Sequence, residues 1–600
     1  MQKTRIAIGV ATVCLLVTTA FAQSDSSQIS GFVKDPSGSI VPNVTVTVTN
    51  EATNQERKVQ TNESGYYVAT NIRPGFYTIS AEATGFKKFV KTGNKLDASL
   101  PLTVDVTLDV GAVTETVEVV ASTATVQSDT ATVGRLVERS QIENMMLNGR
   151  NPMWLAQLKA GVRSGQSLAR FNYDLNNDLQ INGGRTQDFA MSFDGAVAIR
   201  TRANGTSIGV ADVDTVQEIQ VLTANYNAEY GRSGSGQVRI VTRSGTRDFH
   251  GSLYEYFRNN VLDANSWERN RSTNPSQNEK PPARKFNQFG YIVDGPVYIP
   301  GVWNTDRNKL FFLWSQEWVR FREEATETST VPTALMREGN FSELLGPNTF
   351  FSTPRTINDP DTGQPFPGNV IPAGRLSSNG LALLRAYPLP TPGFIQGTNN
   401  FIQTRPQPTN QRKDTIALDF NPVEKHSFRF RHQNYSWKRL DAFRGGLDRA
   451  VTDWNRPNKT ASVNYVWTVS PTIVNEFLTS ASIDRVYIGV QREGGRFERS
   501  RYGIDYPYIF PERKEIFDKI PTVALGTPFR ELDGGPYPAF SSGPIYVVSN
   551  NFTKVFSNHT FKVGALFERS GQNDFDQINV TGVPGGTNNQ NGRFSFTDNR

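Results

Sequence analysis

The residue types that most often carry enzyme chemistry are scarce in this sequence. Its 600 residues include one cysteine, Cys14, and four histidines: His250, His426, His432 and His559. A single cysteine excludes a disulfide framework and a cysteine-based zinc site, and the histidines lack the HExxH spacing of a zinc hydrolase. No nucleophile elbow and no phosphate loop followed by a helix is recognisable. We therefore expect no enzyme activity, no cofactor and no metal site.

Two short segments are candidates for binding. The first is a β-prone run at a polar junction, made of Glu115, Thr116, Val117, Glu118 and Val119. Such a run can pair with a partner's sheet edge through backbone hydrogen bonds, which tolerate sequence variation. The second is the loop 199–209, in which Arg200 and Arg202 could face a solute. An ordinary linker strand and solvated loop arginines remain the alternatives.

The amino terminus has the three parts of a secretory signal peptide. Lys3 and Arg5 are followed by an uncharged run, residues 6–19, and by the small-x-small site Ala20-Phe21-Ala22. The apolar run is shorter than the ~20 residues of a spanning helix. We expect a signal peptide over residues 1–22.

The composition narrows the class of protein further. Lysine and arginine number 63 against 57 acidic residues, and no basic run stands out, so nucleic acid is not an expected partner. Hydrophobic residues make up only 37%, which excludes a bundle of transmembrane helices. The 49 glycines and 33 prolines, with 38 phenylalanines and 19 tyrosines, indicate a β-rich chain with many turns.

Residues 28–110 read as short strands separated by turns. Val44, Val46 and Val48 alternate with threonines, as in a strand with one buried face, and Asp35-Pro36-Ser37-Gly38 is a turn signal. The order of the GxVxDxxG, TNxxGxY and PGxY motifs resembles the carboxypeptidase regulatory-like domain. The resemblance implies a transthyretin-like β-sandwich that acts as an accessory module.

Residues 125–245 carry a different, α/β pattern. The ordered motifs NGR, INGGR, FDG, VQEIQV, AEYG and GQVRIVTRSG resemble the plug domain of TonB-dependent receptors, in the Oar-like branch that has the sandwich in front. The resemblance extends to the linker 111–124, where ETVEV is similar to a TonB box. Four plug residues are expected to form buried polar pairs that hold the plug to the barrel wall: Asn148, Arg150, Arg185 and Asp194.

Residues 246–600 alternate as the strands of a membrane barrel do. Over 461–470, apolar side chains fall on one face and polar side chains on the other, and strands of roughly ten residues recur. The stretch 321–412 reads as a long extracellular loop. The nine or ten strands that can be counted are fewer than the about 22 of outer-membrane transporters, so we expect an incomplete barrel.

The expected fold is therefore mainly β: a transthyretin-like sandwich, an α/β plug, and part of a transmembrane antiparallel barrel. The resemblance implies an outer-membrane receptor of a Gram-negative bacterium that takes up a solute with energy from a periplasmic TonB-type protein. Its other partners would be outer-membrane lipid and an unidentified extracellular solute. The alternative is a non-transporting adhesin or assembly protein, for which a plug has no evident use.

Overall fold

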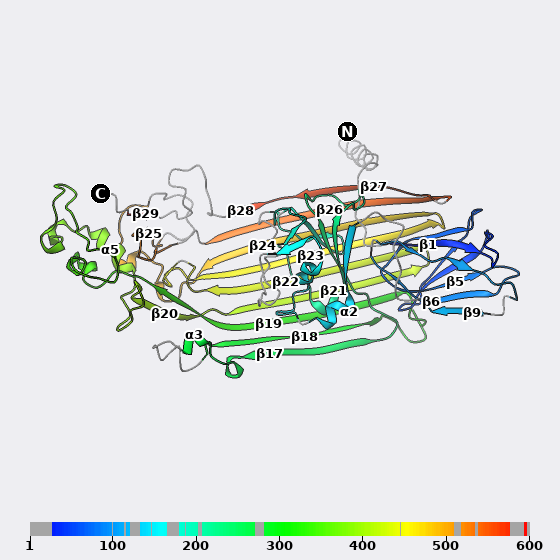
Figure 1. Cartoon of the computed structure of the whole chain (residues 1–600), viewed down its shortest axis with the longest axis horizontal. Coiled ribbons are helices and arrows are strands. Elements are labelled where there is room, and N and C mark those ends of the chain that lie inside the picture. Colours follow the sequence, from blue (N-terminus) through cyan, green and yellow to red (C-terminus); the bar gives the residue numbers. More distant parts are fainter. Residues whose placement is uncertain are drawn as a thin grey trace, which may run out of the picture.

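The computed structural model describes residues 27–98, 100–112, 116–120, 133–145, 147–164, 179–186, 188–201, 207–270, 281–444, 446–508, 518–534, 538–557, 559–575 and 593–596. The expected signal peptide lies outside these residues. Figure 1 shows three parts along the long axis: a blue sandwich at one end, a cyan α/β unit in the middle, and a sheet of long strands that runs along the α/β unit and reaches the sandwich. None of the helices in the described ranges is long and apolar enough to cross a membrane.

The amino-terminal part is a sandwich of two sheets. One sheet contains β1 (Ser27–Lys34), β4 (Tyr66–Ile72), β7 (Leu102–Thr103) and β8 (Val106–Thr107). The other has the order β3-β2-β5-β6-β9, with β2 (Thr45–Asn50), β3 (Glu56–Gln60), β5 (Gly75–Glu82), β6 (Lys88–Leu96) and β9 (Thr116–Val120). The alternating valines 44, 46 and 48 are buried in its core, as the sequence predicts. Gly31 permits the segment between β7 and β8 to lie close against β1, because a Cβ there would lie 2.0 Å from the carbonyl oxygen of Val104.

The middle part has a five-stranded sheet of order β10-β15-β16-β13-β14. Its strands are β10 (Val133–Glu138), β13 (Ala190–Phe193), β14 (Ala196–Val197), β15 (Val216–Ala224) and β16 (Gln237–Thr242), and a separate pair is formed by β11 (Val162–Ser164) and β12 (Leu179–Ile181). The helical turns are α2 (Arg139–Asn144), η1 (Pro152–Leu158) and η2 (Val213–Thr215). The strands β15 and β16 are buried almost throughout, and they carry buried polar side chains such as Glu218 and Arg239 among their apolar residues.

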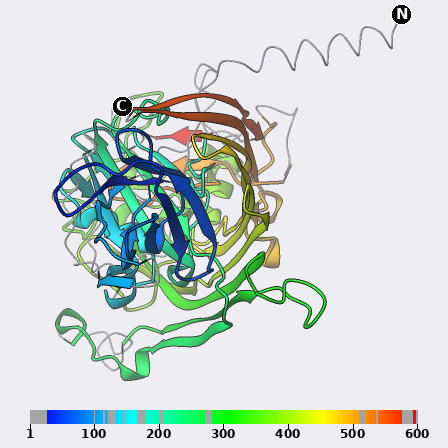
Figure 2. The same ribbon diagram turned by 90° about the vertical axis from the view of Figure 1, so that its right-hand side faces the viewer.

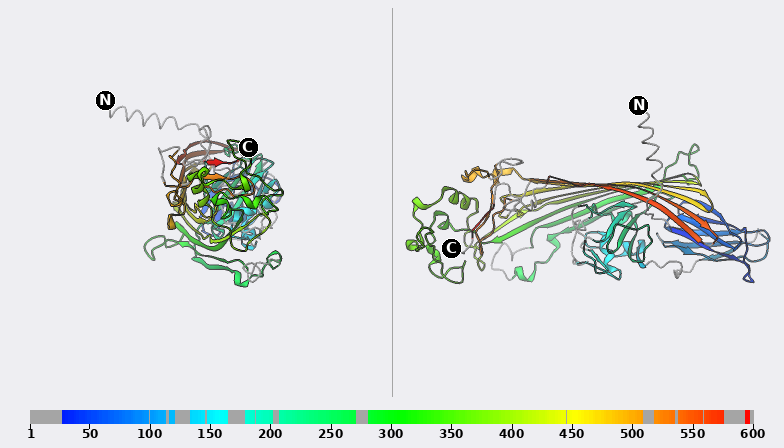
Figure 3. Two further views of the ribbon diagram at one scale, coloured as in Figure 1. Left: turned by 90° about the vertical axis from the view of Figure 1, so that its left-hand side faces the viewer. Right: turned by 90° about the horizontal axis from the view of Figure 1, so that it is seen from above.

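The third part is an 11-stranded antiparallel sheet. Its long strands are β17 (His250–Asn259), β18 (Arg284–Pro296), β19 (Leu310–Ser329), β21 (Thr409–Val423), β22 (His426–Asp441), β23 (Thr452–Ser470), β24 (Ile473–Val490), β26 (Ala539–Phe556) and β27 (His559–Ser570). The short β20 (Phe401–Pro406) and β28 (Asn573–Phe575) pair with β19 and β26. The sheet is strongly curved, and the α/β unit lies on its concave side (Figures 2 and 3).

The faces of this sheet follow the predicted alternation. On β23, Val463 and Trp467 are 37% and 41% exposed on the convex side, whereas Thr460 and Ser462 are buried on the concave side. The apolar residues therefore face outward, as membrane strands require. We call the concave side the lumen and the α/β unit the plug.

The long connections at one end of the sheet fold into an apex. It contains η3 (Asn260–Leu262), α3 (Trp267–Asn270), η4 (Met336–Glu338), η5 (Ser342–Leu344), η6 (Pro367–Asn369), η7 (Ala373–Arg375), α5 (Ser378–Ala386), η8 (Glu493–Gly495), η9 (Ser500–Tyr502), β25 (Thr522–Ala524) and β29 (Arg593–Ser595). Three connections share one apolar core, with members such as Leu383, Leu447 and Val523. The apex is therefore an ordered structure with a core of its own.

Two predictions about local structure need correction. The expected loop 321–412 is shorter, because β19 continues to Ser329, β20 lies inside the predicted range and β21 begins within it. The strands reach 20 residues, longer than the roughly ten expected, because they extend beyond their apolar stretch toward the apex.

Candidate functional site

The candidate coupling strand β9 belongs to the sandwich in this structure. It pairs in parallel with β6, from Lys88 opposite Thr116 to Thr92 opposite Val120. β9 is the last strand in the sheet order, so among the described residues only one of its backbone edges is paired. Glu115 lies outside the described residues, and the other four candidate residues lie in the strand. The expected linker thus contains a segment that already has the extended backbone needed for strand addition.

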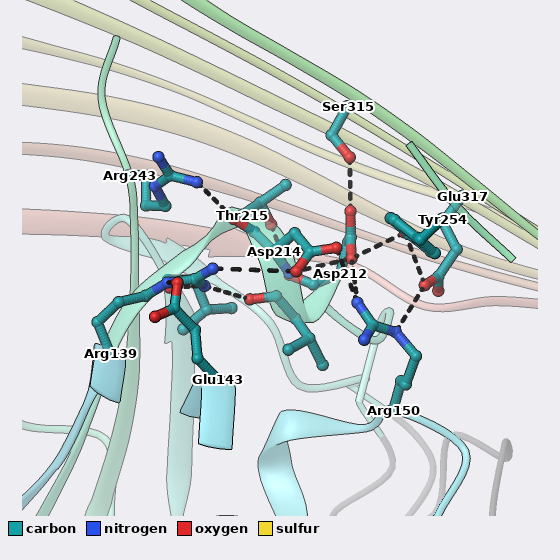
Figure 4. A network of polar contacts seen from close by, with 12 residues as sticks. Arg139, Glu143, Arg150, Asp212, Asp214, Thr215, Arg243, Tyr254, Ser315 and Glu317 are labelled. Carbon is teal, nitrogen blue, oxygen red and sulfur yellow. Dashed lines mark hydrogen bonds and ion pairs between the residues drawn. The ribbon is translucent and has the colours of Figure 1, made fainter. Parts of the chain in front are cut away.

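Arg150 connects the plug to the wall of the sheet. Its Nη2 lies 2.8 Å from Oδ2 of Asp214 in the plug, and its Nε lies 3.5 Å from Oε2 of Glu317 on β19 (Figure 4). The guanidinium carbon lies 4.7 and 4.6 Å from the ring centroids of Tyr254 and Tyr256 on β17. Ion pairs and cation–π contacts therefore act on one side chain that is only 13% exposed.

A second plug residue, Asp212, contacts the same part of the wall. Ser315 on β19 donates a hydrogen bond of 2.5 Å to Oδ2 of Asp212. Glu317 has no exposed side-chain surface, and its Oε1 forms an ion pair with Nζ of Lys413 on β21 at 2.6 Å. The Tyr254 hydroxyl donates to Glu317 at 3.0 Å. The plug is thus held to β17, β19 and β21 by a compact charged cluster.

The protonation of Asp212 depends on this cluster. Burial, with the negative charges of Glu317 and Asp214, raises the pKa of Asp212 to about 6. The neutral form of Asp212 persists to a higher pH than that of a free aspartate, because two other carboxylates share a small, poorly solvated volume with it. Arg139 reinforces the plug side of the cluster, since its guanidinium donates to the carbonyl oxygens of Val213 and Val216 at 2.7 and 2.9 Å.

Arg200, predicted as a solute-facing residue, is buried against the wall. Its Nε lies 2.5 Å from Oδ2 of Asp484 on β24, and both side chains are less than a tenth exposed. Nearby, Asn458 on β23 donates to the carbonyl oxygen of Ile208 at 2.6 Å. The described ends of the loop are therefore attached to β23 and β24, while Arg202 lies outside the described residues.

The expected polar pairs divide into two kinds. Arg150 and Asn148 contact the wall, the latter by accepting a 2.6 Å hydrogen bond from Arg258 on β17. Asp194 stays within the plug, where it accepts from the backbone and side chain of Thr242. Arg185 is 78% exposed and, among the described residues, pairs only with Asp188 in the plug, so the expected buried contact with the wall is wrong for this residue. Contacts with the wall are thus established for two of the four residues.

A carboxylate on β21 joins all three parts of the chain. Asp419 lies 2.6 Å from Arg73, in the β4–β5 turn of the sandwich, and 3.0 Å from Arg431 on β22. Arg431 also donates to Thr242 and Ser244 of the plug segment. The sandwich is therefore fixed at the mouth of the lumen opposite the apex.

The sequence did not single out Asp212, Glu317, Lys413, Asp419 or Asp484. For those of them that lie on strands, the sequence offered one indication, which is a charged residue on the inward face of a strand. A charged side chain buried there requires a partner of opposite charge. The partner itself lies hundreds of residues away and has no local signature. In the described part of the chain, no group of three or more His, Cys, Asp or Glu residues could hold a metal ion.

Comparison with known proteins agrees with this architecture. Residues 241–600 match the family described as an outer membrane beta barrel domain, and residues 28–109 match the carboxypeptidase regulatory-like domain. The first match covers more than half of the chain, so the protein belongs to the outer-membrane β-barrel family. It is a TonB-dependent receptor homologue of the Gram-negative outer membrane.

Among curated proteins, the chain is similar to the TonB-dependent transporter Oar of Myxococcus xanthus, with 28% identity over 295 residues. The alignment covers 48% of this chain and 26% of Oar, so the chain spans about a quarter of that relative's length. Similar solved structures include the Escherichia coli outer membrane transporter YddB (10% identity, TM-score 0.42, 74% of this chain and 48% of that chain). Another is the FrpB iron transporter of Neisseria meningitidis (9% identity, TM-score 0.38, 74% and 60%).

Proposed function

We propose that the protein is a receptor that takes up a solute across the outer membrane with energy from a TonB-type periplasmic protein. In this proposal the energy-coupling partner pairs with the segment from Glu115 to Val119, and its pull displaces the plug from the wall. Homology to the transporter Oar supports outer-membrane transport as the general role.

The observation that carries the proposal is how the plug is attached. The contacts of Arg150 and Asp212 with Glu317 and Ser315 are ionic and polar. The apolar contacts between plug and wall lie in small separate clusters, such as Val210 with Tyr435 and Trp437. Charged contacts can be exchanged for water when the plug moves, whereas a continuous apolar interface would oppose displacement. The attachment thus suits a plug that is held in place at rest and released under force.

On the solute side, we propose that the loop 199–209 forms the plug surface facing the apex. The pair of Arg200 with Asp484 fixes the loop's position, so that Arg202 is the arginine left to meet a solute. The ordered core of the apex favours one other role, an adhesin whose folded loops bind an extracellular partner. The two roles differ in whether binding leads to uptake.

A growth screen followed by two variants tests the proposal. A deletion strain is compared with its parent across iron sources and polysaccharides to find the solute. It is then complemented with Val117→Pro, which removes an N–H from the coupling strand, or with Glu118→Ala, which leaves the backbone intact. We expect the proline variant to bind solute at the cell surface but to lose uptake, and the alanine variant to behave as wild type. Normal uptake by Val117→Pro would refute coupling through this segment.

A further inference from the structure

A cavity of about 860 Å³ lies where the sandwich, the plug and the wall meet. The sandwich contributes the residues 50–57 and 71–77, the plug end contributes 241–246, and the wall contributes turns near 308 and 421–427. Its volume falls within the range of about 300–1,000 Å³ typical of small-molecule sites. None of the contacts in the proposed transport function uses this cavity.

The cavity has an excess of uncompensated positive charge. Four basic side chains line it without an acidic partner within 4.0 Å in the described part of the chain: Arg57, Lys309, Lys425 and Arg429. The lining holds six basic residues and four acidic ones, which are Glu51, Glu56, Asp419 and Glu424. Asp419 is already paired with Arg73 and Arg431, and Glu56 is paired with Lys58. The lining therefore attracts anions.

Arg57 and Arg429 give the strongest indication of a ligand. The Nε atom of each is buried, and neither guanidinium has a hydrogen-bond partner among the described residues. Burying a cation without a partner is costly, so such groups are normally paired with a carboxylate or phosphate. One arginine belongs to β3 of the sandwich and the other to β22 of the wall, so both sides of the cavity present an unused guanidinium.

We propose that this cavity binds a small, multiply charged oxyanion, held between Arg57 of the sandwich and Arg429 of the wall. A guanidinium presents a planar set of N–H donors that matches the oxygens of phosphate and carboxylate groups. Arg429 is on the inward face of β22, as Arg431 is, so the ligand is a soluble anion of the periplasm rather than a lipid headgroup. Bound there, the anion would add a bridge between the sandwich and the wall.

Titration of the purified protein with inorganic pyrophosphate by calorimetry tests the site. We expect saturable binding that weakens at least tenfold in Arg57→Gln, the effect of losing one charge-assisted contact. Lys58→Gln is the matched control, because Lys58 follows Arg57 on the same strand, is 57% exposed and contacts Glu56. Arg429→Gln should weaken binding from the other side of the cavity.

Two results would overturn the proposal. One is the absence of saturable pyrophosphate binding to the wild-type protein. The other is equal affinity in Arg57→Gln and Lys58→Gln while both variants keep the thermal melt of the wild type. Neither result depends on solute uptake, so the binding experiment tests the anion site independently of the transport proposal.

Discussion

Replacing Arg150 by alanine should loosen the plug more than any other single change in the cluster. The substitution removes the ion pairs with Asp214 and Glu317 at 2.8 and 3.5 Å, and the two cation–π contacts with β17. Glu317 has no exposed side-chain surface, and among the described residues it would keep only Lys413 as a cationic partner. Breaking a buried pair by removing one member costs about 3–5 kcal/mol. At about 1.4 kcal/mol per factor of ten, the lower figure raises the population of the displaced plug about two orders of magnitude.

Hydrogen–deuterium exchange in native outer membranes measures that population. Peptides covering β15 and η2 should exchange about a hundred times faster in Arg150→Ala, while peptides from β22 to β24 should be unchanged. Arg185→Ala is the control, because Arg185 is 78% exposed and pairs only with Asp188 inside the plug. If the two variants exchange alike, the cluster does not hold the plug.

Two further predictions concern the same interface. Asp484→Ala should release the end of the loop 199–209, because it leaves Arg200 buried without its carboxylate partner. The released loop should show a new protease cleavage site. An unchanged cleavage pattern would contradict the anchoring role of this ion pair. The pKa of Asp212 is raised to about 6, so protonation of this carboxyl stabilises the docked plug. This contribution is complete below pH about 4 and is lost as the pH rises through 6. Hydrogen exchange in η2, corrected for intrinsic rates, should therefore be faster at about pH 7.5 than at about pH 5. Asp212→Asn should remove the pH dependence of exchange in η2. If this variant keeps the wild-type pH profile, another titrating group causes the dependence.

The sequence predicts the large sheet well, because strand faces are a local property. The alternation over 461–470 predicts which side chains of β23 face outward, and Val463 and Trp467 confirm it. Strand ends were predicted less well. Beyond the apolar stretch of β19, residues such as Arg320, Arg322 and Glu323 resemble a loop, although backbone pairing with β18 keeps all three extended and Arg320 also pairs with β21.

The plug contacts could not be predicted in the same way. Arg200 and Asp484 are 284 positions apart, and the sequence of neither segment indicates the other. The sequence indicated only that an arginine lay in a loop, and a solvent-facing loop is the usual place for one. The strand β9 shows the same limit, because the β-prone run at 115–119 is visible in the sequence but its pairing with β6 is not.

The contact between Arg73 and Asp419 has a consequence for biogenesis. The two residues are 346 positions apart, so the sandwich is exported long before β21 and β22, which form its docking site, have left the inner membrane. Domains of multidomain chains generally fold as units, the amino-terminal one first. The sandwich has a closed core of its own and can wait in the periplasm as a folded body.

The wall, in contrast, must enter the membrane before Asp419 takes its place at the mouth of the lumen. Docking of the sandwich therefore follows the folding of β21 and β22. The pair of Arg73 with Asp419 would then serve as a marker that these strands are assembled, because it can form only after they are in place.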